Sequence, residues 1–446
     1  MAFYFKFKSS HVASSISIMT LAVGLAFAQP RTQKSLAQTP PLPSTKINGA
    51  GATFPATLYQ GLGWFNVYGV ATPPAFNPPG PINPNVQFSY VAIGSGGGIA
   101  AFLSQSPPTS GATIVAPLSF GASDAPLNAA QLQQYQQQVQ PTRGPLVQVP
   151  VVSGAITLTY NNQGLTVPQS GLRLSRATYC GILGGAITNW NDPSITADNG
   201  GVPVSANLPI TVARRSDGSG TTFNLSNHLN TVCQAPSVPS AFVWNRGVGL
   251  NSATVPAPNP LAANTVYWPS TFLSAAGNPG VLRTINTTVG AIGYVDNGDR
   301  LQARKPAALL QNSSGNYIAP TSESTTAAFL DVVVPDSNII TVRVTDPPDP
   351  QAYPIIGVTY LLFYGRYNDS ATSAGIKGFI NWALAPETPT PTTENPGGEA
   401  EGTLPSVPNP TSETNPNTIA TTRGFAPLTP NLKAAVIRAV NNNIAP

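Results

Sequence analysis

The sequence predicts an α/β protein built mainly on parallel sheets. Segments with the alternating or short apolar patterns of strands are interleaved with segments of helical periodicity. At three places a Gly-rich turn leads into a predicted helix. The chain has 446 residues, which is enough for two domains with substantial hydrophobic cores.

The first 28 residues have the features of a secretory signal peptide. Lys6 and Lys8 form a short basic region, residues 16–27 are apolar, and residues 26–28 (AFA) form a small-residue cleavage site. The alternative is an uncleaved membrane anchor, although the apolar stretch is shorter than the roughly 20 residues that span a bilayer. Residues 29–46 are rich in Pro, Gln, Ser and Thr, and we predict a disordered leader there.

The composition limits the kinds of partner. Charged residues make up 9% of the chain and the formal net charge is +4, without a basic stripe, so nucleic acid is not expected. No Cys-x-x-Cys motif occurs and His228 is the single histidine after residue 28, so we expect no metal site and no cofactor. In an exported chain we expect a disulfide between Cys180 and Cys233, with two buried thiols as the alternative.

The first two turns each lead into a predicted helix. Residues 49–55 (GAGATFP) end in a proline that suits a first helical turn, and the apolar side chains after it continue at helical spacing. These side chains are Leu58, Leu62 and Phe65. Residues 93–98 (IGSGGG) follow an alternating strand and precede a second helix. The strand contains Val86, Phe88 and Tyr90, and the helix contains Ile99, Phe102 and Leu103.

The third turn, residues 213–223 (ARRSDGSGTTF), has the character of an oxyanion site. A predicted strand with Ile210 and Val212 precedes it, and a predicted helix follows. Unpaired N–H groups and the positive end of the helix dipole favour an anion there. Ser219, Gly220 and Thr221 lie on the first turn of this helix.

Arg215 adds a guanidinium fork that suits a tetrahedral oxyanion, and Asp217 is placed to hold that fork. Asp124 in residues 120–127 (FGASDAPL) is either a solvated turn acid or an acceptor that faces the anion. An acceptor is useful only if the ligand carries a proton, as phosphate does near neutral pH and sulfate does not.

Residues 385–423 contain many prolines and glutamates and few large apolar side chains. We predict a disordered, acidic insertion there. The insertion connects a helix that ends near residue 384 to a final helix over residues 431–443.

Motifs in this order resemble the periplasmic phosphate-binding protein of the high-affinity ABC-type phosphate transporter. They are residues 49–55, 93–95, 120–127, 187–193 (ITNWNDP), the Arg215 turn, 290–294 (GAIGY) and 353–355 (YPI). The resemblance implies a two-lobed type II periplasmic-binding-protein fold with a hinge. Lobe 1 would be discontinuous, with residues 44–152 plus 354–446, and lobe 2 would be residues 153–353.

The resemblance also implies a ligand set in the cleft between the lobes. Thr53 and Phe54 would offer backbone N–H groups, Ser95 its hydroxyl and amide, and Asp124 an acceptor for the phosphate proton. Arg215 would supply the cation, braced by Asp217. The remaining donors would come from Ser219, Gly220 and Thr221.

The function implied is that of a monomeric periplasmic receptor that binds inorganic phosphate and delivers it to the membrane permease of an ABC transporter, without catalysis. One alternative is an exported phosphomonoesterase on the same fold, for which Ser219 would be the best nucleophile. A receptor for another oxyanion and a non-transport surface module are the others.

Overall fold

The computed structural model describes residues 45–71, 81–107, 117–329, 334–335, 337–386 and 414–446. The predicted signal peptide, nearly all of the predicted leader, and residues 387–413 of the predicted insertion lie outside these ranges. The described residues belong to one compact unit. Within them, no helix is both long and apolar enough to cross a membrane.

The strands are β1 (Thr45–Gly51), β2 (Val70–Ala71), β3 (Val86–Ala92), β4 (Phe120–Ser123), β5 (Leu146–Tyr160), β6 (Arg173–Leu174), β7 (Thr211–Arg215), β8 (Asn251–Thr254), β9 (Thr265–Trp268), β10 (Leu273–Ala275), β11 (Ala291–Asp296), β12 (Leu309–Gln311), β13 (Tyr317–Ile318), β14 (Ile356–Tyr364) and β15 (Phe425–Ala426).

The α-helices are α1 (Ala56–Tyr59), α2 (Trp64–Tyr68), α3 (Ser95–Ser104), α4 (Ala129–Gln134), α5 (Gln140–Arg143), α6 (Arg176–Gly184), α7 (Pro193–Asp198), α8 (Gly220–Val232), α9 (Gly277–Thr287), α10 (Asn297–Gln302), α11 (Ser322–Ala327), α12 (Ser370–Ala383), α13 (Pro416–Thr422) and α14 (Pro430–Asn443). A π-helical turn covers Tyr135–Val139 and a 3₁₀ turn covers Ser240–Phe242.

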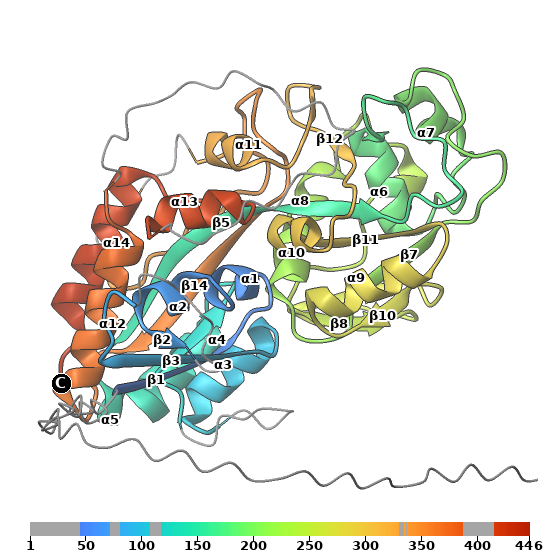
Figure 1. Ribbon diagram of the computed structural model, residues 1–446. Helices are drawn as coiled ribbons and strands as arrows, with labels where there is room; N and C mark the ends of the chain where they lie inside the picture. The colour runs from blue at the N-terminus through green and yellow to red at the C-terminus, as the bar shows by residue number, and fades with distance from the viewer. Residues whose placement is uncertain (1–44, 72–80, 108–116, 330–333, 336, 387–413) are drawn as a thin grey trace, which may run out of the picture. The chain divides into compact units, whose positions relative to one another are not determined.

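Ten strands form one sheet in the order β10-β7-β11-β5-β14-β4-β1-β3-β2, with β15 paired to β5. The long strand β5 joins two groups of strands (Figure 1). Its first part, to Ala155, pairs with β14, and its last part, from Ile156, pairs with β11. The strands β1–β4, β14 and β15 are the core of the first lobe, and β7, β10 and β11 are the core of the second lobe. The fold is therefore a two-lobed α/β fold.

The sequence predicted mainly parallel pairing, and the sheet has parallel pairs within each lobe together with antiparallel pairs at β5 and β14. β1, β2, β3 and β4 pair in parallel, and so do β7, β10 and β11. The pairs of β14 with β4 and β5, and of β5 with β11, are antiparallel. The long strand β5 runs from the first lobe into the second, β14 pairs with its first part, and every residue of both strands is buried. A strand buried on both faces has a continuous apolar pattern whatever its direction, so sequence does not reveal that direction.

Three predicted segments differ from the structure. The helix expected from Leu58 to Phe65 is divided into α1 and α2, because Gly61 has a φ of 58° and Gly63 begins α2. Part of the predicted insertion is the helix α13, which Asn415 caps and which buries Ile419. The last two residues of the predicted leader, 45 and 46, belong to β1.

Other predicted elements are confirmed. The strand and helix around residues 93–98 are β3 and α3, and the final helix is α14. Cys180 in α6 and Cys233 at the end of α8 form a disulfide with Cα atoms 5.8 Å apart. The helix α9 packs against β11 and β7, so the second lobe has its own helical cover.

Candidate anion-binding site

The second and third predicted turns lie against each other. β7 ends at Arg215 and leads to α8, while β3 leads to α3, whose first residue is Ser95. The N–H of Gly96 donates to the carbonyl of Gly218 at 2.8 Å. A Cβ atom on Gly96 would lie 2.9 Å from the Cα of Gly218, so the approach requires glycine. The N-termini of α3 and α8 therefore meet, one from each lobe.

The Ser95 hydroxyl is the centre of this contact. Its Oγ accepts hydrogen bonds from the N–H groups of Asp124 and Gly220, both at 3.1 Å. The same hydroxyl lies 3.4 Å from Oδ2 of Asp124, to which it donates. Three predicted ligand residues from three separate segments are thus in direct contact.

Asp124 is a carboxyl group in an almost dry environment, with 2% of its surface exposed. The Thr359 hydroxyl donates to Oδ1 at 2.7 Å, and the Asn224 side chain donates to the backbone carbonyl at 2.6 Å. Burial raises the pKa of Asp124 to about 7, against the opposing effects of the Thr359 hydrogen bond and the Arg215 charge. Asp124 is therefore a buried acid that can change its protonation near neutral pH, and not a solvated turn acid.

The Arg215 side chain is almost completely buried, with 1% of its surface exposed. Hydrogen bonds hold its guanidinium group on two sides. Its Nε donates to Oδ1 of Asp217 at 2.7 Å, and its Nη2 donates to Oδ2. Nη1 donates to Oδ1 of Asn278 at 2.7 Å and makes a longer contact of 3.4 Å with Thr221. Of the five guanidinium N–H groups, one on Nη2 has no partner among the described residues and one on Nη1 has only the long contact. A ligand that reaches Arg215 would therefore take the N–H of Nη2 that has no partner among these residues, and could compete with Thr221 for the N–H of Nη1.

Asp217 is the brace that the sequence predicted. Burial raises the pKa of its carboxyl, but the hydrogen bonds and charge of Arg215 more than offset this, so the pKa lies below its usual value. The N–H of Gly277, at the start of α9, also donates to Oδ1 at 2.9 Å. A Cβ atom on Gly94 would lie 2.3 Å from Oδ2 of Asp217, so the first lobe closes directly over this ion pair.

Thr53 and Phe54 are placed differently from each other. The Thr53 hydroxyl accepts from the N–H of Asn278 at 3.3 Å, so Thr53 reaches the Arg215 cluster through Asn278. The Phe54 ring is fully buried and packs edge-on against Phe425, with ring centroids 5.8 Å apart. Only the Phe54 backbone can serve a ligand. The helix expected to direct these amides, α1, has four residues and begins at Ala56.

Ser219 is committed to the helix that it begins. Its Oγ accepts from the N–H of Thr222 at 3.1 Å as the N-cap of α8, and its own N–H donates to Leu250 at 2.9 Å. Ser219 was expected to supply donors to the ligand. In the structure the Ser219 amide already has a partner, so only its hydroxyl hydrogen is left to donate.

Sequence analysis missed several polar contacts around the site. They come from Asn224, Asn278 and Thr359. Tyr294, which belongs to one of the motifs, also has a polar role, because its hydroxyl accepts from the backbone N–H of Arg215 at 3.0 Å. Asn224 lies one helical turn after Gly220, and this spacing indicates only weakly that its side chain contacts the anion-binding turn. Asn278 and Thr359 had no local signal, because distant segments bring them to the site.

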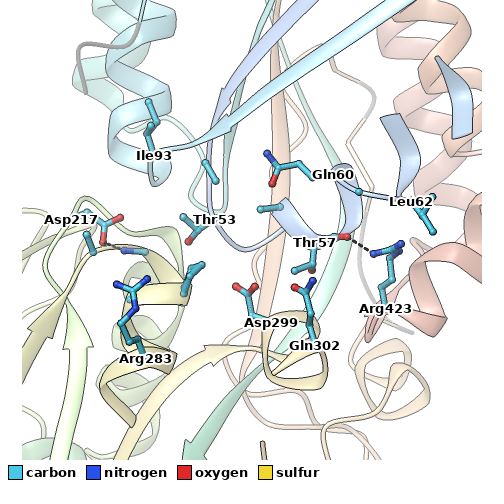
Figure 2. Close-up of a pocket in the computed structure, with 17 residues that line it drawn as sticks. Thr53, Thr57, Gln60, Leu62, Ile93, Asp217, Arg283, Asp299, Gln302 and Arg423 are labelled. Atoms are coloured by element: carbon cyan, nitrogen blue, oxygen red, sulfur yellow. Dashed lines mark hydrogen bonds between the residues drawn. The ribbon is translucent and has the colours of Figure 1, made fainter. Parts of the chain in front are cut away.

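A cavity of about 850 Å³ lies beside this cluster. Thr53 and Asp217 line it, while Ser95, Asp124 and Arg215 do not. Figure 2 shows Arg283 and Asp299 pointing into the same cavity. The buried cluster therefore contacts this cavity through Thr53 and Asp217, and the cavity lining combines polar side chains with apolar ones such as Leu62 and Ile93.

The fold and the cluster together define a two-lobed binding-protein architecture with polar groups gathered where the lobes meet. The chain belongs to the PBP superfamily, because the PBP superfamily domain matches residues 66–387.

The chain is also similar to individual proteins. It is 29% identical over 341 residues to Phosphate-binding protein PstS of Xylella fastidiosa, covering 76% of this chain and 78% of that protein. It is 28% identical over 444 residues to Alkaline phosphatase L of Pseudomonas aeruginosa, covering 97% and 94%. The structure of the periplasmic phosphate-binding protein PfluDING matches with a TM-score of 0.62 at 24% identity, covering 90% of this chain and 99% of that one.

Proposed function

We propose that this protein is a receptor that binds inorganic phosphate between its lobes and delivers it to the permease of an ABC transporter. Similarity to proteins named phosphate-binding protein PstS supports the ligand. One observation of the structure carries the proposal, which is the buried carboxyl of Asp124 inside a cluster of anion-binding donors.

The chemistry of Asp124 favours phosphate over sulfate. A carboxylate accepts a proton-bearing ligand, and phosphate carries a proton near neutral pH while sulfate does not. Sulfate and a charged Asp124 would face each other as two acceptors without a hydrogen, which is costly in a dry site. Because the pKa of Asp124 is about 7, we expect sulfate to be rejected more strongly at pH 8 than in acid.

The ligand would replace contacts that the site groups now make with each other. The Ser95 hydroxyl and the Gly220 amide, which are bonded to each other, would both turn to the ligand. The N–H groups on Nη1 and Nη2 of Arg215 would give a bidentate contact. The proposed ligand residues are Thr53, Phe54, Ser95, Asp124, Arg215, Ser219, Gly220 and Thr221.

We also propose how the chain is divided into a signal peptide and two lobes. Lobe 1 is residues 44–152 plus 354–446, and lobe 2 is residues 153–353, so that β5 and β14 carry the hinge. The change of β5 from β14 to β11 after Ala155 supports this division. A signal peptide at residues 1–28 directs a monomer to the periplasm, where closure around the ligand presents the docking surface.

Calorimetric titration of ligand-stripped protein with phosphate, then with sulfate, tests the proposal. We expect tight phosphate binding that excess sulfate does not reduce at pH 8. Asp124→Asn should lose this discrimination, because the amide can donate to sulfate. Asp349→Asn, outside the proposed ligand set, is the matched control and should behave as the wild type. Absence of phosphate binding in folded protein would disprove the receptor function.

A second candidate is a phosphomonoesterase, favoured by the similarity to Alkaline phosphatase L over 97% of this chain. The groups suited to such chemistry are engaged elsewhere. Ser219 caps α8, and both ring nitrogens of the buried His228 have partners, with Tyr179 at 2.9 Å and Thr345 at 2.6 Å. Burial lowers the pKa of His228 to about 4, so it is neutral at pH 7.

We therefore propose that the protein is not an enzyme. Hydrolysis of p-nitrophenyl phosphate by the purified protein, with and without added Zn²⁺ or Mg²⁺, tests this. Turnover that disappears in Ser219→Ala and Arg215→Ala would establish the phosphatase instead.

A further inference from the structure

The side chain of Asn278 lies between a buried cation and a buried acid. Its Oδ1 accepts from Nη1 of Arg215 at 2.7 Å, and its Nδ2 donates to Oδ2 of Asp296 at 2.6 Å. None of the three side chains is more than 1% exposed. The orientation of the amide follows from its neighbours, because a guanidinium only donates and a carboxylate only accepts.

Asp296 is itself fixed in place. Its Oδ1 accepts from the N–H of Asp299 at 2.8 Å as the N-cap of α10. Burial raises the pKa of Asp296, and the pKa of the neighbouring Asp299 is raised further by burial and by the Asp296 charge. The Asp296 carboxyl therefore lies on the far side of the Asn278 amide from Arg215.

The neutrality of Asn278 matters because Arg215 already has a carboxylate partner. Asp217 occupies Nε and Nη2 of the guanidinium. A second carboxylate on Nη1 would cancel the remaining positive character and repel an anion at the guanidinium. A neutral acceptor holds Nη1 in place without that effect.

Asn278 also reaches the first lobe, since its backbone N–H donates to the Thr53 hydroxyl at 3.3 Å. Asn278 is the second residue of α9, and the N–H of the first residue, Gly277, donates to Asp217. The residue thus contacts the cation directly and a proposed ligand residue of the opposite lobe.

We infer that Asn278 is a positioning residue of the oxyanion site, which orients Arg215 through a neutral acceptor while Asp296 fixes the orientation of the Asn278 amide. This role rests on the proposed phosphate-binding function. It deepens that function by assigning the residue that keeps the Arg215 charge available to the ligand.

The exchange variant Asn278→Asp with Asp296→Asn tests the inference. It keeps the number of hydrogen bonds and the net charge, but it moves the carboxylate into direct contact with Arg215. Phosphate affinity by calorimetry and melting temperature are measured for the wild type, both single variants and the exchange. We expect the exchange to melt closer to the wild type than either single variant does, and to bind phosphate at least tenfold more weakly.

Phosphate affinity of the exchange within twofold of the wild type would overturn the inference, because a purely structural contact would survive the exchange. If the exchange does not fold, Asn278→Ala and Asn278→Ser replace it. Asn278→Ser should retain more phosphate affinity than Asn278→Ala, because the serine hydroxyl can still accept a hydrogen bond. Wild-type phosphate affinity in Asn278→Ala would overturn the positioning role of Asn278. Phosphate binding by the wild type separates the two proposals, because its absence would disprove the receptor function itself.

Discussion

The Thr359 hydroxyl donates a hydrogen bond of 2.7 Å to the buried carboxylate of Asp124, from a position 235 residues further along the chain. The pairing of β14 with β4 creates this contact, because Tyr360 is opposite Ser123 in the sheet. Thr359 stabilises the charged form of Asp124 and lowers its pKa against the effect of burial. A residue of β14 therefore lowers the pKa of the acid in the anion-binding cluster.

Removal of this hydroxyl should cost more at high pH than at low pH. In Thr359→Val, the charged Asp124 loses a donor at pH 8, and we expect a loss of about 1–3 kcal/mol in the free energy of unfolding. At pH 5 the carboxyl is protonated and the loss should be smaller. Urea unfolding at both pH values measures the difference. Thr359→Ser keeps the hydroxyl and is the control. An equal loss at both pH values would contradict the prediction.

Asp124 should give the ligand-free protein a stability that decreases as the pH rises. Its pKa in the folded protein is about 7, above the unfolded value of about 4, so the folded state retains a proton that the unfolded chain releases. The contribution is complete below pH 4 and is lost as the pH rises through 7, with a size of about 4 kcal/mol.

Urea unfolding of the wild type and Asp124→Asn between pH 4 and 8 isolates this contribution. Asp296 and Asp299, whose pKa values are also raised, remain in both proteins and cancel in the comparison. The wild type should lose more stability than the variant over this range. Parallel curves would mean that Asp124 has an ordinary pKa.

Arg215→Lys should weaken phosphate binding although it conserves the charge. A lysine cannot hold Asp217, Asn278 and a bidentate ligand together. A loss of about 2 kcal/mol, or roughly thirtyfold in affinity, is expected for charge-assisted hydrogen bonds. Calorimetry measures it, with the exposed Arg283→Lys as the matched control. Unchanged affinity in Arg215→Lys would show that the guanidinium geometry is not needed.

The disulfide should stabilise the fold without affecting the site. Cys233 ends α8, and the anion-binding turn precedes the other end of this helix of 13 residues, about 20 Å away. Reduction, or Cys180→Ser with Cys233→Ser, should lower the free energy of unfolding by about 4 kcal/mol on the loop-entropy model. Denaturant unfolding measures this loss. Phosphate affinity of the folded variant should stay within twofold, and a larger change would show coupling through α8.

Local features of this protein can be predicted from its sequence alone. The Gly-rich turns at residues 93–98 and 213–223 lead into the helices α3 and α8, and Arg215 with Asp217 two residues later forms its ion pair within one turn. Such features depend on residue type and short spacing, so they can be predicted. The resemblance to a family then indicated the two lobes.

The surroundings of the cluster follow from long-range packing. This packing divided the helix expected at Leu58–Phe65, folded α13 within the predicted insertion, and paired β5 with β14 in antiparallel direction. It also brought Thr359 to Asp124 and Asn278 to Arg215. For a single polar residue in an apolar strand or at a helix start, no local sequence pattern predicts its hydrogen-bond partner. Its role follows from sheet pairing and lobe contact, which join segments that are far apart in the sequence.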